Sequence, residues 1–229
     1  MTPLVKAAMI GAIGMTDLLL AHDADPNLMM ANGCTALHTA VANATIPVPL
    51  IATLLDHGAD PNAALGSGDT ALTIAIQRHS YRSDVHVLGA LLEGGANVNA
   101  GGPGSAADGY VDCWTALLTA AHQGHLGAVN LFLDHGAATD TANDEGWTSL
   151  MWASLKGFVP VAEALLDAGA DPNQTMPDDG YTALMWACQN GHNTIVQLLL
   201  ARSANPNLQM LDDGLTALMW ASNRGCGNE

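Results

Sequence analysis

Residues 148–173 and 182–207 read TSLMWASLKGFVPVAEALLDAGADPN and TALMWACQNGHNTIVQLLLARSANPN, and these two stretches decide the fold. Each begins with a Thr before a short, Ala-rich apolar run, and a Thr hydroxyl in this place accepts a free backbone N–H at a helix start. Gly157 and Gly191 then end the run, because Gly tolerates the left-handed conformation that follows many helices. A second apolar run and a Pro-containing loop complete each stretch. The sequence therefore predicts a unit of helix, turn, helix and loop.

This unit recurs along the whole chain. Its Thr returns at intervals of 33 to 35 residues, with one longer interval of 45 residues, at Thr2, Thr35, Thr70, Thr115, Thr148, Thr182 and Thr216. Such a period is typical of a stacked repeat array. We expect six full helix pairs and a partial seventh in a single domain over residues 1–229, with units of about 1–29, 30–64, 65–109, 110–142, 143–176, 177–210 and 211–229.

Two motifs carry a resemblance to a known family. Gly33-Cys34-Thr35-Ala36-Leu37-His38 and Gly191-His192 closely follow the pattern of ankyrin repeats, and the chain resembles that family over essentially its whole length. The resemblance implies an all-α solenoid of stacked helix-turn-helix units, with projecting β-hairpin loops and a concave face. Since no single helix pair buries its apolar side alone, stacking of neighbouring units supplies the core.

The charge balance restricts the classes of partner. The chain has 22 acidic and 6 basic residues, a formal net charge of -16. This surface repels the phosphates of nucleic acids and anionic membranes, because such ligands need clustered Lys and Arg. It attracts basic protein segments instead. The sequence therefore predicts a protein partner, plausibly basic, and neither nucleic acid nor membrane.

The cysteines and histidines predict no chemistry. The four cysteines, far apart and without a C-x-x-C pair, indicate reduced thiols and a cytoplasmic, intracellular location: Cys34, Cys113, Cys188 and Cys226. Cys188 occupies a small core position, whereas Cys34 and Cys113 fall in hairpins. His122 and His125 lack a third metal ligand nearby in sequence. Since phosphate-loop, zinc-protease and serine-hydrolase motifs are also missing, we expect no enzyme, no cofactor and no metal site.

Aromatic residues gather in the C-terminal half and are the best candidates for a binding site. Three tryptophans occupy equivalent places in consecutive first helices: Trp152, Trp186 and Trp220. Four further residues directly precede the helix-capping Thr of their units: Trp114, Trp147, Tyr181 and Leu215. The family resemblance implies that the residue before Thr faces the concave side, so Trp147 and Tyr181 are expected to be exposed there. For the three helix tryptophans, packing between neighbouring first helices is an equally good interpretation.

Acidic pairs stand beside this stripe at three adjacent hairpin tips: Asp144-Glu145, Asp178-Asp179 and Asp212-Asp213. One Asp per tip is explained by turn formation. The second acid exceeds what a turn needs, and acid beside aromatic suits an Arg- or Lys-rich segment through charge pairing and cation–π contact.

The leading hypothesis is a scaffold or adaptor that binds a partner segment, plausibly basic, on this concave aromatic and acidic face. Residues Ala100 to Asp112 predict an elongated hairpin loop, and such loops often lie on the binding face of repeat arrays. Both ends lack a polar capping unit, which favours a fragment of a longer protein. One alternative is therefore the targeting or regulatory arm of a larger enzyme. Another is end-to-end self-association through an uncapped C-terminal end that exposes Met219 and Trp220.

Overall fold

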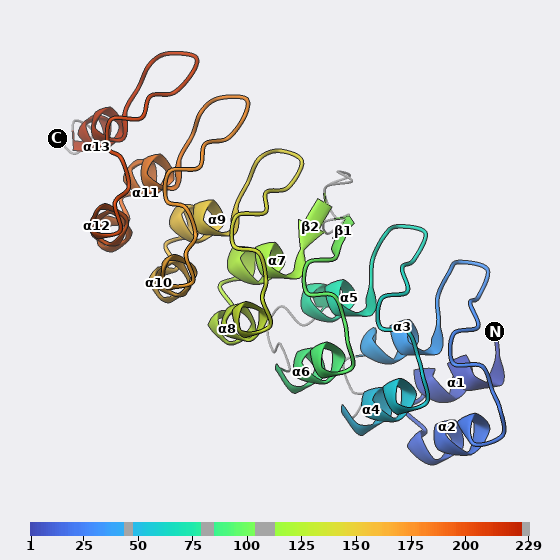
Figure 1. Cartoon of the computed structure of the whole chain (residues 1–229). Helices are drawn as coiled ribbons and strands as arrows, with labels where there is room; N and C mark the ends of the chain where they lie inside the picture. Colours follow the sequence, from blue (N-terminus) through green and yellow to red (C-terminus); the bar gives the residue numbers. More distant parts are fainter. Residues whose placement is uncertain (44–47, 79–84, 104–112, 226–229) are drawn as a thin grey trace. The chain divides into compact units, whose positions relative to one another are not determined.

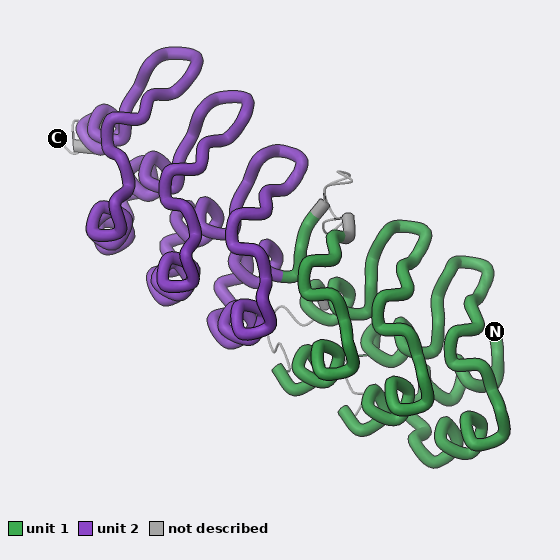
Figure 2. The backbone as a smooth tube through the Cα atoms, viewed as in Figure 1, with its two compact units in different colours: residues 1–116 green, residues 117–229 purple. Residues whose placement is uncertain are grey.

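The computed structural model describes the chain except for residues 44–47, 79–84, 104–112 and 226–229. Its residues fall into two compact units, unit 1 from Met1 to Ala116 and unit 2 from Leu117 to Glu229 (Figure 2). Both units are helical and built from the predicted pairs of helices. In the described part of the chain, no helix has both the length and the apolar character needed to cross a membrane.

Unit 1 consists of three helix pairs and a short two-stranded sheet. The elements are α1 (Pro3–Met9), α2 (Ile13–Leu20), α3 (Ala36–Val41), α4 (Val48–Asp56), α5 (Ala71–Arg78), α6 (Val85–Glu93), β1 (Gly101–Pro103) and β2 (Cys113–Thr115). The first helices α1, α3 and α5 pack in one row, and the second helices α2, α4 and α6 pack in another (Figure 1). Each first helix also packs on the second helix of its own pair.

Unit 2 repeats this arrangement. Its helices are α7 (Ala116–Gln123, which begins at the boundary residue), α8 (Leu126–Asp134), α9 (Ser149–Lys156), α10 (Val159–Asp167), α11 (Ala183–Asn190), α12 (Asn193–Ala201) and α13 (Ala217–Gly225). Among the first helices, α11 packs between α9 and α13, and among the second helices, α10 packs between α8 and α12. The loops that precede α9, α11 and α13 project beyond the row of first helices (Figure 1).

Threonine caps and glycine stops position the helices as predicted. The hydroxyl oxygens of Thr148 and Thr182 accept the backbone N–H groups of Met151 and Met185, both at 3.2 Å. Gly157 and Gly191 end α9 and α11 in the left-handed conformation, with φ of 79° and 71°. These signals set the phase of the repeat, because they fix where every first helix begins and ends.

The apolar residue two places after each Thr forms the centre of the core. In six successive units this residue is Leu at 1–3% exposure: Leu4, Leu37, Leu72, Leu117, Leu150 and Leu184. Cys188 is buried, as predicted for a small core position. Leu218 stands at the same place in the last unit but is 72% exposed.

The projecting loops are narrow hairpins, as predicted. Isolated antiparallel bridges join Ala64 to Thr70, Thr175 to Thr182 and Gln209 to Thr216, and β1 pairs with β2 across the expected long loop. Most of that loop, residues 104–112, lies outside the described part of the chain.

Neighbouring hairpins in unit 2 touch. The backbone N–H of Leu211 donates to the carbonyl of Asp179 at 2.9 Å. Pro177 lies against Gly146, whose φ of 87° and lack of room for a Cβ both require Gly. The hairpins of unit 2 therefore stack on one another as the helices do.

Candidate functional site

The aromatic residues of unit 2 form one continuous stack, which we call the aromatic ladder: Trp152, Trp147, Trp186, Tyr181 and Trp220. Trp147 lies between two tryptophans. Its ring centroid is 4.1 Å from that of Trp152 and 4.8 Å from that of Trp186, with interplanar angles of 19° and 27°. The prediction that stacked units align these residues is therefore confirmed within unit 2.

The stack continues through Tyr181 with the same alternation. Tyr181 stacks on Trp186 at 4.4 Å and 25°, and lies 6.0 Å from Trp220 at a more tilted 40°. A residue from the hairpin thus inserts between the helix tryptophan of its own unit and that of the next unit. Offset stacking at such distances stabilises aromatic pairs beyond the burial of their surface.

Burial in the ladder is the reverse of what the sequence led us to expect. Trp147 and Tyr181 are only 9% and 8% exposed, so the prediction that they present an open surface is wrong. The rings on either side of each residue cover its faces. The three helix tryptophans are half-buried, so they present more of the ladder to solvent than the hairpin residues do.

Trp114 and Leu215 are the two remaining candidates that precede a helix-capping Thr. Trp114 belongs to β2 of unit 1 and is half-buried. Leu215 takes the place before Thr in the last unit and is half-buried, without an aromatic ring to continue the ladder. In the second repeat, the place before the helix-capping Thr holds a small residue, Cys34. Its Sγ lies 3.4 Å from the Thr39 hydroxyl oxygen. Leu215 and Cys34 therefore supply no aromatic ring at these places.

The acidic pairs at the hairpin tips divide into two roles. Carboxylate oxygens of Asp179 and Asp213 each accept a backbone N–H at 3.0 Å, from Tyr181 and Leu215 respectively. The first acid of each pair, Asp178 or Asp212, is exposed. One acid of each pair thus forms the turn and the other faces solvent.

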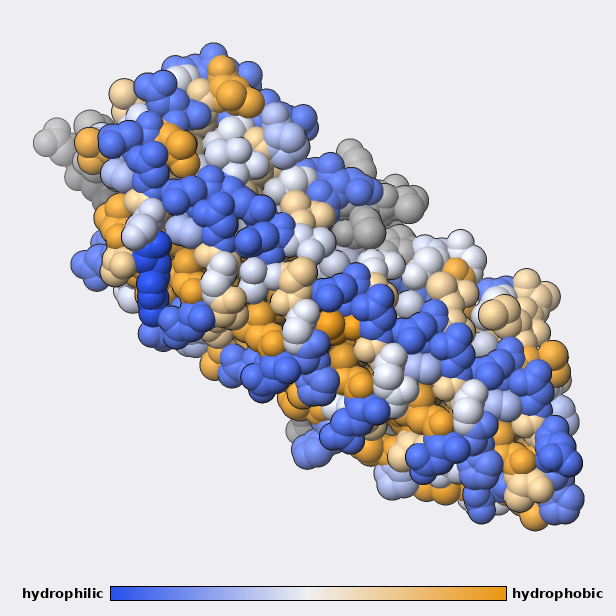
Figure 3. Space-filling model, viewed as in Figure 1, coloured by the Kyte–Doolittle hydropathy of each residue, from blue (hydrophilic) through white to orange (hydrophobic). Residues whose placement is uncertain are grey.

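In the first hairpin of unit 2, an Asn takes the place of the turn-forming Asp. Asn143 accepts the backbone N–H of Trp147 through Oδ1 at 2.7 Å, which is the role that Asp179 plays one unit later. Asp144 and Glu145 are both exposed. Hydrophilic side chains cover much of the face seen in Figure 3, with hydrophobic surface between them.

Opposite charges stand beside Trp152, at one end of the ladder, and beside Tyr181, the last ring before Trp220. Burial raises the pKa of Tyr181, and the carboxylates of Asp179 and Asp213 raise that pKa further. At the other end, Lys156 Nζ lies 6.0 Å from the centroid of the Trp152 ring, within cation–π reach.

His122 packs on the basic end of the ladder. Its ring meets that of Trp152 edge-on at 4.6 Å and 87°. Burial lowers the pKa of His122, and Lys156 lowers it further. From the sequence, His122 was considered only as a metal ligand, and Lys156 was not identified as a candidate. The signal for Lys156 was its position one helical turn after Trp152, where side chains share a face.

The ladder includes a buried polar atom without a partner. The indole Nε1 of Trp186 is buried and has no acceptor among the described residues. A buried N–H without a partner costs about 1–3 kcal/mol.

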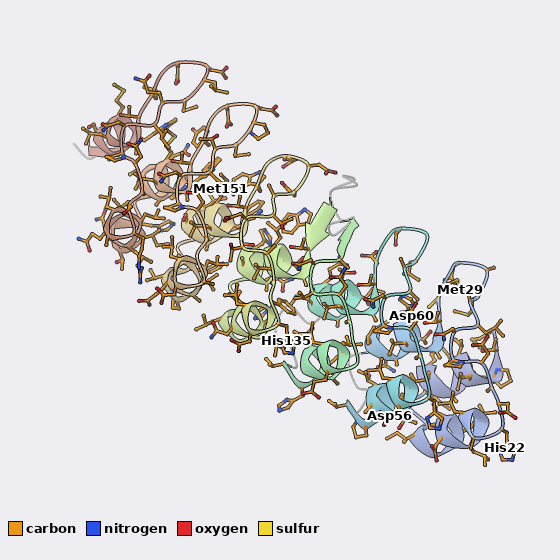
Figure 4. The ribbon with its side chains drawn as sticks, in the orientation of Figure 1. His22, Met29, Asp56, Asp60, His135 and Met151 are labelled. Carbon is orange, nitrogen blue, oxygen red and sulfur yellow. The ribbon has the colours of Figure 1, made fainter. Side chains whose placement is uncertain are left out.

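Three other histidines have a structural role at the ends of second helices. His22, His57 and His135 follow α2, α4 and α8, and the Nδ1 of each lies 2.8–2.9 Å from the carbonyl oxygen four residues earlier (Figure 4 labels His22 and His135). Among the described residues, no group of three metal-ligating side chains comes together.

Sequence comparisons report relatives that share the repeats. The family model described as ankyrin repeats (3 copies) matches residues 4–102, 91–176 and 168–228. The chain is 27% identical over 170 residues to the palmitoyltransferase AKR1 of Lachancea kluyveri, covering 74% of the chain and 17% of the relative. It is 45% identical over 87 residues to the probable E3 ubiquitin-protein ligase XBOS34 of Oryza sativa subsp. japonica, covering 38% of the chain and 16% of that ligase. The chain thus spans about a sixth of the length of either relative.

Solved structures with the same fold match nearly end to end. The ankyrin repeat domain of Bcl-3, a member of the IkappaB protein family, superposes with a TM-score of 0.81 at 26% identity, over 96% of the chain and 94% of that domain. An ankyrin repeat domain from Acinetobacter baumannii AYE superposes with a TM-score of 0.76 at 28% identity, over 89% and 98%.

Proposed function

Because the chain belongs to the ankyrin-repeat family, we propose that it is a protein-interaction scaffold whose unit 2 binds a basic segment of a partner protein on the aromatic ladder and hairpin tips. The family provides the general role, since ankyrin repeats are protein-binding modules. The fold alone does not name a partner, so the site has to supply its chemistry.

The observation that carries the proposal is the combination of half-buried tryptophans with exposed acids on three adjacent hairpins. Trp and Tyr are enriched among the residues that dominate binding energy at interfaces. Asp178 and Asp212 are exposed and are not the acids that form their turns. A Lys or Arg side chain gains both charge pairing with such acids and contact with an aromatic face.

The test uses charge reversal at the acids that the turns do not need. Peptide phage display on the intact chain selects binders, and the enriched peptides are then titrated against the wild type and an Asp178→Lys, Asp212→Lys variant. We expect enrichment in Lys and Arg and about tenfold weaker binding to the variant. The matched control, Asp134→Lys with Glu163→Lys, makes the same charge change at exposed residues of α8 and α10. Equal loss in both variants, or binders without excess basic residues, contradicts the proposal.

A second candidate is end-to-end self-association. Leu218 and Met219 are 72% and 50% exposed, whereas their counterparts Leu184 and Met185 are 2% and 1% exposed because neighbouring elements cover them. Of the two residues that the sequence suggested for this contact, Trp220 is half-buried against the ladder. Sedimentation velocity across a hundredfold range of concentration tests the idea. The Leu218→Ser variant, which replaces an exposed apolar side chain of this surface, is measured alongside. The idea is excluded if the wild type stays monomeric, or if the variant associates as strongly as the wild type.

A third candidate is suggested by the two relatives, whose names describe enzymes of which the repeats form a small part. In this role the repeats recruit a substrate protein for a catalytic domain in the same polypeptide. The sequence of the full gene product tests it, since this candidate requires a catalytic domain beyond the repeats.

A further inference from the structure

The aromatic ladder has a direction, because a positive charge stands at its Trp152 end and negative charges stand near Tyr181, the last ring before Trp220. Lys156 lies at the Trp152 end, 6.0 Å from that ring. Near the other end, the carboxylate of Asp179 accepts the backbone N–H of Tyr181 and that of Asp213 accepts the backbone N–H of Leu215, both at 3.0 Å. Between these ends run three successive ring stacks of 4.1, 4.8 and 4.4 Å. A uniformly basic segment meets attraction at one end and repulsion at the other.

Tyr181 ties the acids to this part of the ladder. Its side chain is 8% exposed, and its backbone N–H donates to a carboxylate oxygen of Asp179 at 3.0 Å. On the next hairpin, a carboxylate oxygen of Asp213 accepts the backbone N–H of Leu215, also at 3.0 Å. Both carboxylates raise the pKa of Tyr181. The surroundings of Tyr181 are therefore acidic.

The ladder also sets a length. Its three stacking distances limit the separation of the Trp152 and Tyr181 rings to about 13 Å, which an extended peptide covers with about four residues at roughly 3.3 Å each. Lys156 reaches further out by up to 6.0 Å. Charges of a bound segment that pair with both ends are therefore about four to six residues apart.

We infer that the ladder recognises a dipolar peptide segment, with a basic side chain at the Asp179–Asp213 end and a carboxylate at the Lys156 end, separated by about four to six residues. This inference rests on the proposed function and sharpens it, because it replaces a generally basic partner with one of defined charge spacing. The residues between the two charges lie along the half-buried tryptophans, so apolar side chains suit them best.

The test compares three fluorescein-labelled peptides with capped ends. One has Glu and Arg separated by four apolar residues, one has the same composition with Glu and Arg adjacent, and one has Gln in place of Glu. At low ionic strength, we expect the separated peptide to bind the intact chain about threefold more tightly than either of the others. Equal affinity of all three overturns the inference but leaves the proposed function standing. No binding by any of them overturns both.

Two conservative variants locate the effect. Lys156→Gln removes the positive end, and Asp213→Asn removes a charge while it keeps the oxygen that accepts the Leu215 N–H. We expect Lys156→Gln to abolish the advantage of the separated peptide over the Gln peptide, and Asp213→Asn to weaken all three peptides. The matched control, Glu163→Gln on α10, leaves every affinity unchanged. If the separated peptide keeps its advantage in Lys156→Gln, the inference is wrong.

Discussion

At the scale of single residues, His38 shows how a repeat position becomes sensitive to acid. It is 1% exposed in α3, where Nδ1 lies 2.8 Å from the Thr35 hydroxyl and Nε2 lies 3.0 Å from the Ala63 carbonyl oxygen. The neutral ring fits this site, because Nε2–H donates to the carbonyl while Nδ1 accepts from the hydroxyl. Burial lowers the pKa of His38, and this outweighs the opposite influence of Asp69 and Asp60.

We therefore predict that unit 1 loses stability as the pH falls below about 6.5, the ordinary His value, towards the lowered pKa of His38. Between these two values the unfolded chain binds a proton that the folded chain does not. Urea unfolding of the wild type and His38→Gln, followed by circular dichroism at pH 8 and pH 5.5, measures the effect. We expect His38→Gln to have a lower free energy of unfolding than the wild type at pH 8, and to lose less of it than the wild type between pH 8 and pH 5.5. His22→Gln, at an exposed histidine, is the control and keeps the wild-type response.

At the scale of elements, hydrogen bonds from one loop to the next link successive repeats. Asn27 and Asn173 each accept a backbone N–H of the following repeat at 2.7 Å and donate Nδ2–H to one of its carbonyl oxygens. Asp140 stands at this place in unit 2 and accepts the Asp171 N–H at 2.9 Å. A carboxylate has no N–H for the second bond.

Asp140→Asn is accordingly predicted to stabilise unit 2 by about 1 kcal/mol, since the amide donates to the Gly169 carbonyl and removes a negative charge beside Asp171. Urea denaturation gives the change in unfolding free energy. Asp134→Asn makes the same charge change on α8 outside this network and serves as the comparison. If the two substitutions have the same effect, the missing hydrogen bond is not the cause.

The ladder allows a sharper test of contact between elements. Trp147 and Trp186 stack directly, whereas Trp220 contacts Tyr181 in a tilted arrangement. A double-mutant cycle with Leu at positions 147 and 186 is expected to give a coupling of about 0.5–1.5 kcal/mol. The same cycle at positions 147 and 220 is expected to give a value near zero. Similar couplings in both cycles contradict a stack held by neighbouring rings.

The sequence predicted which residues belong to the ladder but not how they cover one another. The phase of the Thr residues placed Trp152 and Trp186 at one helix position and Trp147 and Tyr181 before the next helices. Whether the hairpin residue faces solvent depends on the spacing of adjacent units, which no single unit encodes. Because that spacing admits one ring between two tryptophans, Trp147 and Tyr181 are covered. Likewise, the sequence does not show which carboxylate of Asp178-Asp179 accepts the backbone N–H of the turn. The structure shows that it is Asp179.

At the scale of the whole molecule, the net charge of -16 opposes compact folding. Among the described residues, one ion pair, between Arg202 and Asp167 at 2.6 Å, offsets part of this repulsion. Salt screens exposed charges over a length of about 10 Å at 0.1 M.

Stability is therefore predicted to increase with ionic strength. Between 20 mM and 300 mM NaCl, we expect the midpoint of thermal unfolding to rise by about 2–4 °C, which corresponds to about 1 kcal/mol for a chain of this size. Scanning calorimetry measures this shift. A midpoint that falls as salt is added indicates that attractive charge pairs dominate instead.

The close stacking of the ladder also has an optical consequence. Four of the five tryptophans of the chain belong to the aromatic ladder of unit 2, with neighbouring rings within 4.1–6.0 Å of each other. At such separations indole chromophores exchange excitation energy and give coupled signals in the near-ultraviolet dichroism spectrum. Intrinsic tryptophan fluorescence therefore reports mainly on residues 147–220. Tryptophan fluorescence and near-ultraviolet dichroism of unit 2 are therefore expected to change when a ligand binds to the aromatic ladder.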